Sequence, residues 1–422
     1  MGTPCNIKPE NKMPKNSLQS DSAKRGVVLN PDCNKLKILF LIPYFIPAYR
    51  FGGPIRGTYE TGLRLVKKGH EVTVYTTDAW EPKKRIDKKE DIINGMHIKY
   101  FPNINNLLAS KYKIFSPVGM YSQVKKKINN FDIIHIQEYY TIITFIGGKL
   151  SKKYNKKYLV SIRGALSDVP MQSKNNLKKI FNFFLKKFLF SADAITVQTE
   201  NERKDCRKHN LKNLRIIRNG IDTEMFKKIP PRSIFRKKYE IKPDENVLLF
   251  VGRINKIKGL KYLIEALSRL KDRKIRLFII GPDDNYLGEL KTYIDKFNLN
   301  NINIIKGLYG AEKLEALAGS DIFVLPSIYD CSPNSMLEAC ASGLPIITTT
   351  ENGLHKIISD GAGILINSKD SKALSSAIIK LITDPQLMKK MGAKGSKIVF
   401  DKYSWNKVTD ELEKLYFKML GD

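Results

Sequence analysis

Asp330 and Glu338 are two carboxylates separated by seven residues in the stretch YDCSPNSMLEACASG. Carboxylates accept hydrogen bonds from hydroxyl groups, so a pair at the two ends of one short loop can hold a sugar or a ribose. The alternative is an Asp in a solvated turn and a Glu on the exposed face of a helix. Two residues at one spacing do not decide between these interpretations.

A short helix is predicted between the two acids. Ser332 suits the N-cap, Pro333 the first helical position and Gly343 the stop, so the helix is expected from about Pro333 to Ser342. The free N–H groups of its first turn, near Asn334 to Met336, form a natural anion site. Because N–H groups hold phosphate and carboxylates hold hydroxyls, the segment favours a phosphorylated sugar as its ligand.

Two basic side chains follow another predicted strand. The run Val247–Val251 is apolar and is followed by Gly252, Arg253, Lys258 and Gly259. Cations fixed at the carboxyl end of a buried strand suit a diphosphate leaving group. We therefore expect these residues and the two acids to belong to one site.

The elements around these residues alternate between strands and helices in both halves of the chain. The apolar run KILFLIP predicts a buried strand from Lys37, and a loop with Gly52 and Gly53 leads from it into a helix. The run FDIIHIQ predicts a further inner strand in which His135 packs. No GxGxxG fingerprint occurs in this half. Repeated strand–loop–helix units predict an α/β fold with two doubly wound, Rossmann-like domains. After the Gly-Gly loop, Ile55, Tyr59, Leu63 and Val66 keep the spacing of a helix.

Taken in order, these motifs resemble the retaining glycosyltransferases of the GT-B fold, group 1 (fourth) family. The family signature is an acid, seven residues and a second acid, usually with Glu at both ends, whereas Asp330 is one methylene shorter. The resemblance implies that Asp330 meets hydroxyls of the donor sugar and that Glu338 meets the nucleotide ribose. It also implies that Arg253 and Lys258 bind the donor diphosphate.

The resemblance covers about Lys37 to Leu420 and implies further site residues. Gly53 approaches the donor phosphates, Gly52 lies on the acceptor side, and Gly307 and Leu308 hold the base through the backbone. The residues implied at the donor site, apart from the catalytic ones, are Gly53, Gly252, Gly307, Leu308, Ser335, Met336, Leu337 and Glu338.

Arg163 departs from the family pattern, because many relatives have a His at this position. An Arg can grip a phosphate or an acidic sugar with two hydrogen bonds but is a poor general base. We include Arg163 with Asp330, Arg253 and Lys258 among the candidate catalytic residues. Asp168, close by in the sequence, is a candidate for assisting the acceptor.

The resemblance implies two domains that face each other across a cleft. Residues 1–34 are expected to form a disordered tail, because they are rich in Lys, Pro, Asn and Ser. Residues 35–225 are assigned to the acceptor domain, completed by a C-terminal helix, 404–420, that crosses back to it. Residues 226–403 are assigned to the nucleotide-sugar domain.

The chain is strongly basic, with a formal charge of +31 over 422 residues. Basic residues occur in every segment and no nucleic-acid motif is present, so no nucleic-acid partner is expected. The basic, aromatic helix predicted near residues 177–189 has two interpretations, a peripheral contact with an anionic membrane or a core-packed helix with solvated lysines.

Five cysteines without metal-ligand spacing and no visible signal sequence favour a cytoplasmic location, including the inner face of the membrane. No Asp-x-Asp sequence occurs, so we expect no metal and no cofactor beyond the nucleotide sugar itself. The resemblance then implies a retaining hexosyltransferase that acts in cell-surface polysaccharide or lipopolysaccharide synthesis. Its donor is expected to be a UDP-sugar and its acceptor a glycan or a lipid-linked glycan. The alternatives are a sugar-nucleotide epimerase of similar fold and a basic nucleic-acid- or membrane-associated protein without transferase activity.

Overall fold

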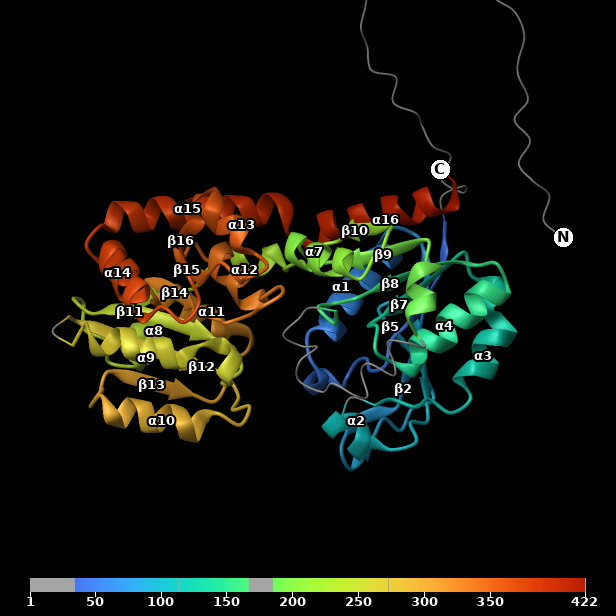
Figure 1. The fold of residues 1–422 in the computed structure, drawn as a ribbon, viewed down its shortest axis with the longest axis horizontal. Helices are drawn as coiled ribbons and strands as arrows, with labels where there is room; N and C mark the ends of the chain where they lie inside the picture. Colours follow the sequence, from blue (N-terminus) through green and yellow to red (C-terminus); the bar gives the residue numbers. More distant parts are fainter. Residues whose placement is uncertain (1–34, 113, 167–184, 272, 422) are drawn as a thin grey trace, which may run out of the picture. The chain divides into compact units, whose positions relative to one another are not determined.

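The computed structural model of the protein describes residues 35–112, 114–166, 185–271 and 273–421. The chain divides into two compact units, Met1–Lys35 and Leu36–Asp422. All elements named below lie in the second unit (Figure 1). The predicted tail, residues 1–34, and most of the predicted helix 177–189 lie outside the described residues.

The first sheet has the strand order β10-β9-β8-β7-β1-β2-β6-β5 within the described residues, and β5 alone of these strands pairs in the antiparallel sense. Its inner strands are continuous apolar runs because helices cover both faces of a parallel sheet. The strands are β1 (Lys37–Leu41), β2 (Glu71–Thr77), β5 (Glu90–Ile93), β6 (Met96–Phe101), β7 (Ile133–Gln137), β8 (Lys157–Ser161), β9 (Ala194–Val197) and β10 (Leu214–Ile216), with a small separate pair, β3 (Ala79–Glu81) and β4 (Lys84–Arg85).

Two clusters of buried side chains lie against this sheet. The helices that supply or cover them are α1 (Pro54–Lys67), α2 (Asn106–Tyr112), α3 (Met120–Lys127), α4 (Ile142–Lys153), α7 (Glu200–Lys208) and α16 (Trp405–Leu420).

Helix α1 forms where the helical spacing predicted it, and Tyr59 and Val66 pack against the core. Ile55 is buried, but Tyr59, Leu63 and Val66 are only half-buried. Gly62 lies on the buried face, where an added Cβ would stand 2.5 Å from the Met96 sulfur. Small side chains on that face let the helix approach the sheet closely, which a search for apolar spacing alone does not detect.

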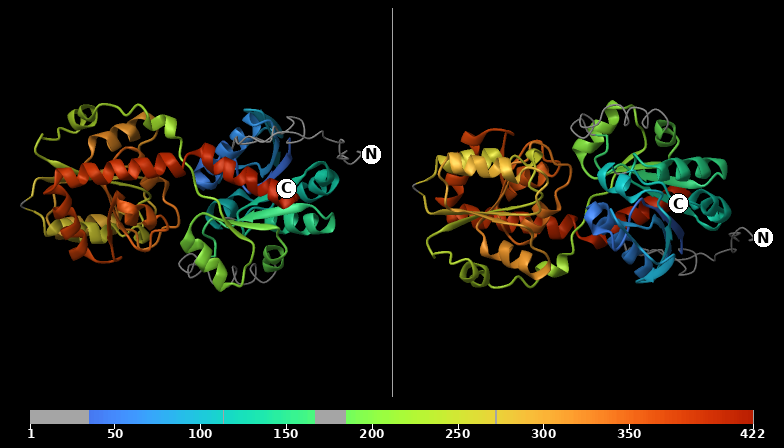
Figure 2. Two further views of the ribbon diagram at one scale, coloured as in Figure 1. Left: turned by 90° about the horizontal axis from the view of Figure 1, so that it is seen from above. Right: turned by 90° about the horizontal axis from the view of Figure 1, so that it is seen from below.

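The C-terminal helix α16 returns to the first sheet, as predicted (Figure 2). Leu412, Leu415 and Tyr416 belong to the same buried cluster as β1, and the Tyr416 hydroxyl lies 2.7 Å from His135 Nδ1. On the surface, Glu413 accepts a hydrogen bond from Lys68 Nζ at 2.6 Å. Residues from the end of the chain therefore complete the core formed by its beginning.

The second sheet is entirely parallel within the described residues, with the order β13-β12-β11-β14-β15-β16. Its strands are β11 (Asn246–Val251), β12 (Ile275–Ile280), β13 (Ile302–Ile305), β14 (Ile322–Leu325), β15 (Ile346–Thr349) and β16 (Gly363–Ile366). The helices that accompany it are α8 (Arg232–Lys238), α9 (Leu260–Ser268), α10 (Leu287–Lys296), α11 (Gly310–Gly319), α12 (Asn334–Ala341), α13 (His355–Ile357), α14 (Ser371–Ile382) and α15 (Pro385–Lys402).

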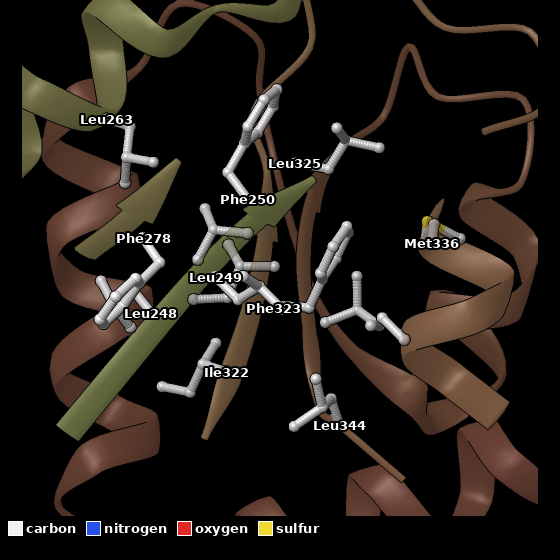
Figure 3. Packing of buried hydrophobic residues seen from close by; sticks show 14 of the residues in the cluster. Leu248, Leu249, Phe250, Leu263, Phe278, Ile322, Phe323, Leu325, Met336 and Leu344 are labelled. Atoms are coloured by element: carbon white, nitrogen blue, oxygen red, sulfur yellow. The ribbon is translucent and has the colours of Figure 1, made fainter. Parts of the chain in front are cut away.

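The core of the second domain forms around β11 and β14 (Figure 3). Their side chains, including Phe250 and Phe323, lie between the helix that carries Leu263 and the helix that carries Met336. Phe250 and Phe323 are fully buried, and truncating either to Ala would cost about 3–5 kcal/mol of stability. This core fixes the strand ends from which the candidate site projects.

Both sheets reverse their strand order next to their first strand, at β1 and β7 in the first sheet and at β11 and β14 in the second. Ligands of doubly wound folds bind outside the carboxyl ends of the strands at such a point. The predicted fold class, with two Rossmann-like domains and a returning C-terminal helix, is confirmed. The predicted boundary between residues 225 and 226 stays a prediction. No helix in the described part of the chain is long and apolar enough to cross a membrane.

Candidate functional site

The loop after β11 is held in place by a glycine. Asn255 accepts a hydrogen bond from the Lys258 N–H at 3.2 Å and closes the short helical turn Lys256–Lys258. Gly259 follows with φ +67, and a Cβ added there would stand 2.0 Å from the Pro326 carbonyl oxygen. Only glycine lets the loop approach the end of β14 this closely. The loop after β11 is thereby brought to the loop that carries Asp330.

Lys258 and Asp330 form a short ion pair at this point. Their side chains are 17% and 14% exposed, so the pair is shielded from most of the solvent. The backbone of Asp330 is also fixed, because its carbonyl accepts a hydrogen bond from the Gly353 N–H at 2.8 Å. A cation and a carboxylate are therefore positioned together at the reversal point of the second sheet.

Helix α12 begins one residue later than predicted. Pro333 is the N-cap, with an extended ψ of 110, and its carbonyl accepts the first helical bond from the Leu337 N–H at 3.4 Å. Ser332 is therefore not the cap, and its hydroxyl is buried with no hydrogen-bond partner among the described residues. The end is as predicted, since Gly343 has φ +79. No side chain caps the N-terminus of α12, so its first N–H groups remain open to a ligand.

Glu338 is buried, with a side chain that is 7% exposed. Lys313 of α11 lies 2.8 Å from Glu338 Oε1, and Arg56 of α1 lies 3.4 Å from the same oxygen. The interpretation of Glu338 as a solvated surface residue is therefore wrong. Neither basic partner was predicted, because no motif or spacing marks Lys313 or Arg56.

Arg253 points to a different partner from Lys258. Its Nη1 lies 2.8 Å from Asp284 Oδ2, and its side chain is 67% exposed. The two predicted cations share a loop but have separate carboxylates in this structure. Gly252 precedes Arg253, and a Cβ added there would stand 3.9 Å from Lys258 Cε.

Arg163 is half-buried and has φ +51, a strained conformation for a residue with a side chain. Its guanidinium donates to Gln137 Oε1, from Nη2 at 2.6 Å and from Nε at 3.2 Å, and burial lowers its pKa. The next residue, Gly164, approaches Cys331, since an added Cβ would stand 3.5 Å from the Cys331 Cβ. Arg163 thus lies in a loop that contacts the neighbour of Asp330. Asp168 lies outside the described residues.

A buried carboxylate supports the Arg163 loop. Glu202 accepts a hydrogen bond from the Gln198 N–H at 2.6 Å and a short one from the Gly164 N–H. Burial raises the pKa of Glu202, and burial also raises the pKa of the Cys331 thiol well above its ordinary value. Cys331 therefore stays protonated at neutral pH.

The remaining predicted residues lie at the ends of other strands. Gly52 has φ +122 and is exposed, and Gly53 is the N-cap of α1, the helix that carries Arg56. Gly307 and Leu308 follow β13 and are half-buried. The structure places all of these residues at strand ends or helix starts, and none of these positions tests their predicted roles.

Comparison with known proteins agrees with this geometry. Residues 231–398 match the family described as glycosyl transferases group 1, and residues 51–225 match the family described as glycosyltransferase family 4. The chain belongs to the group 1 glycosyltransferases. The two matches together span the second sheet, the first sheet apart from β1, and the segments that carry Lys258, Asp330 and Glu338.

Individual relatives are distant. An uncharacterized glycosyltransferase of Methanocaldococcus jannaschii is 25% identical over 378 residues, covering 85% of this chain and 93% of that protein. The N-acetyl-alpha-D-glucosaminyl L-malate synthase of Bacillus anthracis is 24% identical over 386 residues, covering 88% and 95%. Among solved structures, HepE of Anabaena in complex with UDP-glucose has a TM-score of 0.72 at 16% identity, covering 91% of this chain and 100% of that one. The structural likeness establishes the shared GT-B fold.

Proposed function

We propose that this glycosyltransferase moves a hexose, with retention of configuration, from a UDP-sugar to a hydroxyl of a glycan or lipid-linked glycan in cell-surface polysaccharide synthesis. The observation that carries the proposal is the shielded Lys258–Asp330 pair beside the open N-terminus of α12. HepE of Anabaena, which has the same fold, was solved with UDP-glucose. We further propose that residues 226–403 bind the donor and that residues 35–225, with 404–420, bind the acceptor.

The chain offers a way to stabilise the departing diphosphate. In the transfer, the bond between the anomeric carbon and the diphosphate oxygen breaks, and its electron pair stays on that oxygen. Lys258, together with the N–H groups near Ser335, would stabilise the new negative charge. Arg253 is exposed and reaches the same phosphates if it leaves Asp284.

The acceptor hydroxyl supplies the nucleophile of the transfer. Its oxygen forms the new bond to the anomeric carbon, and its proton passes to the departing diphosphate oxygen. Asp330 would hold hydroxyls of the donor sugar once the donor phosphate attracts Lys258. Arg163 would hold a phosphate or an acidic sugar with two hydrogen bonds. The cytoplasmic location stays a prediction.

The test uses two lysines of one helical turn. Lys258 is paired with Asp330, whereas Lys256 is 70% exposed and paired with Glu289 at 2.7 Å. We expect a saturating donor nucleotide to stabilise the wild type and Lys256→Met by about 2.7 kcal/mol at a hundredfold excess over the dissociation constant. Lys258→Met should lose at least about tenfold in nucleotide affinity, since one charge-assisted contact is worth about 1.5–3 kcal/mol.

The measurement is a thermal-shift and calorimetric titration with UDP, GDP, ADP and common UDP-sugars. Stabilisation by UDP alone supports the proposed UDP-sugar donor. Stabilisation by GDP or ADP alone shows that the donor carries guanine or adenine in place of uracil. Equal affinities of Lys256→Met and Lys258→Met would contradict the proposed site. Conversion of a UDP-sugar to its epimer without any acceptor would favour the epimerase alternative instead.

A further inference from the structure

A cluster of apolar side chains is exposed on the first domain between residues 104 and 121. Isolated exposed apolar residues are normal on a protein surface, but a concentration of them in one short stretch marks an interaction site. The side chains, here called the 104–121 patch, are Ile104 (69% exposed), Leu107 (58%), Leu108 (41%), Tyr112 (44%), Val118 (54%) and Tyr121 (36%).

The fold holds these side chains outward. Asn103 donates to Asn106 Oδ1 at 2.9 Å, and Asn106 donates to the Lys84 carbonyl at 3.0 Å, so the inner face of α2 is bound to the domain. Ala109 is also buried on that face. Leu107, Leu108 and Tyr112 of the same helix are exposed, and Leu108 and Tyr112, four residues apart, lie on one side of it.

Two backbone bonds complete the patch. The Ile104 N–H donates to the Ser116 carbonyl at 3.1 Å, and the Val118 N–H donates to the Pro102 carbonyl at 2.8 Å. These bonds bring the two ends of the loop together. Ile104 and Val118 therefore flank the base of the segment that presents α2.

The charge around the patch is almost entirely positive. Residues 92–131 contain six Lys and no Asp or Glu. Lys111 lies 5.4 Å from the Tyr112 ring centre, and Lys149 of α4 lies 5.7 Å from that of Tyr121. The exposed run Lys125–Lys127 closes helix α3, which begins beside Tyr121.

Two acids on elements next to the patch are paired with basic residues. Asp78, whose Oδ1 accepts a hydrogen bond from the Asn103 N–H, pairs with Arg85 at 2.9 Å. Glu81 of β3 pairs with Lys84 at 3.3 Å. The surface thus combines exposed Leu, Ile and Val with cations and aromatic rings.

We infer that the 104–121 patch docks the protein on an anionic lipid surface, with its apolar side chains at the boundary of headgroups and acyl chains. Lysines near such a surface are attracted to anionic headgroups, while apolar side chains gain by leaving water. A second copy of this chain fits less well, because it would bring the same uncompensated lysines to the interface. A nucleic acid would use the lysines but would leave Leu107 and Leu108 in water.

This surface is independent of the donor site, and its test needs no catalytic activity. The full-length protein is sedimented with vesicles of phosphatidylcholine alone and of phosphatidylcholine mixed with phosphatidylglycerol. We expect binding to the mixed vesicles, decreasing but not vanishing with added salt. Leu107→Ser/Leu108→Ser should weaken this binding at least about tenfold, because each Leu contributes buried apolar area. The matched control is Ile229→Ser/Ile234→Ser, two side chains that are 39% and 42% exposed elsewhere, and it should bind as the wild type does.

Insertion is measured separately with Leu108→Trp. Its fluorescence should shift to the blue with mixed vesicles and not with phosphatidylcholine alone, relative to the wild type with Trp80 and Trp405. Far-ultraviolet circular dichroism confirms that each variant is folded. Unchanged vesicle binding by Leu107→Ser/Leu108→Ser overturns the inference. The absence of vesicle binding by the wild type also overturns it. If the wild type instead forms a concentration-dependent dimer that Leu107→Ser/Leu108→Ser does not form, the patch binds a second copy of the chain and the inference is likewise overturned.

Discussion

The pair between Lys313 and Glu338 is strong enough to measure by itself. Lys313 Nζ lies 2.8 Å from Glu338 Oε1, and the two side chains are 17% and 7% exposed. At an effective dielectric constant of about 20, two unit charges at this distance attract by about 6 kcal/mol before desolvation. Desolvation removes most of that attraction, and charge-assisted hydrogen bonds retain about 1.5–3 kcal/mol. We therefore expect a coupling energy of about 2 kcal/mol.

A double-mutant cycle isolates this energy. Glu338→Gln and Lys313→Met should each destabilise the protein by about 2–3 kcal/mol, and the double variant by little more than either, because the second change removes a partner that is already lost. Thermal unfolding in the absence of nucleotide measures the cycle. A destabilisation of about 2 kcal/mol corresponds to about 4–8 °C for a domain of this size.

Arg56 provides the control within the same site. It lies 3.4 Å from the same Glu338 oxygen, but its side chain is 38% exposed. Exposed pairs contribute about 0–1 kcal/mol, so the coupling of Arg56→Met with Glu338→Gln should be about 0.5 kcal/mol or less. Two results would refute the assignment of Lys313 as the residue that holds Glu338. One is a Lys313–Glu338 coupling below about 0.5 kcal/mol, and the other is an Arg56–Glu338 coupling larger than that of Lys313 with Glu338. If Glu338 meets the ribose, Lys313→Met should also weaken nucleotide binding severalfold.

Two further predictions concern the folded core and the donor loop. Burial lowers the pKa of His135 to about 3, so the folded protein keeps this ring neutral while the unfolded chain binds a proton below about pH 6.5. Stability should therefore fall as the pH drops from about 6.5 toward 3, by up to about 1.4 kcal/mol per pH unit from this residue, and His135→Gln should remove that part of the slope. His135→Gln should also be less stable at about pH 7.5, because it loses bonds to Tyr416 and Ser161; urea unfolding at several pH values measures both effects. Gly259→Ala should destabilise the protein by more than about 1 kcal/mol, because φ is +67 and the new Cβ would overlap the Pro326 carbonyl, and thermal unfolding with and without UDP measures the loss.

Each of these two predictions has an outcome that would contradict it, and the prediction for Gly259 also has a control variant. Gly288→Ala in α10 adds a Cβ that meets nothing within 4 Å, so it should leave stability unchanged or slightly raised. Wild-type stability for Gly259→Ala would show that the loop is not held by close backbone approach. A pH slope of His135→Gln identical to that of the wild type would show that His135 titrates normally in the folded protein.

The sequence was sufficient for the fold and for the chain positions of the loops that form the candidate site. Apolar runs such as KILFL and NVLLFV become strands because a parallel sheet buries both of their faces. The glycines of the loop after β11 and the cations between them also follow from local chemistry, since backbone conformation and charge are properties of one short segment. Even the one-residue error at the start of α12 is local, because both Ser332 and Pro333 favour a helix start.

Tertiary structure alone decided which side chains meet. Glu338 bonds to Lys313, 25 residues away, and to Arg56, 282 residues away, and Asn219 donates to Asn334 at 2.8 Å across 115 residues. The sequence also did not predict the positive φ of Arg163 or the exposure of the apolar side chains on α2. Periodicity and spacing in the sequence predict which face of its own helix or strand a side chain lies on. The partner of a side chain depends on the order of strands in the sheet and on distances of a few ångströms between separate loops, and only the folded chain sets these.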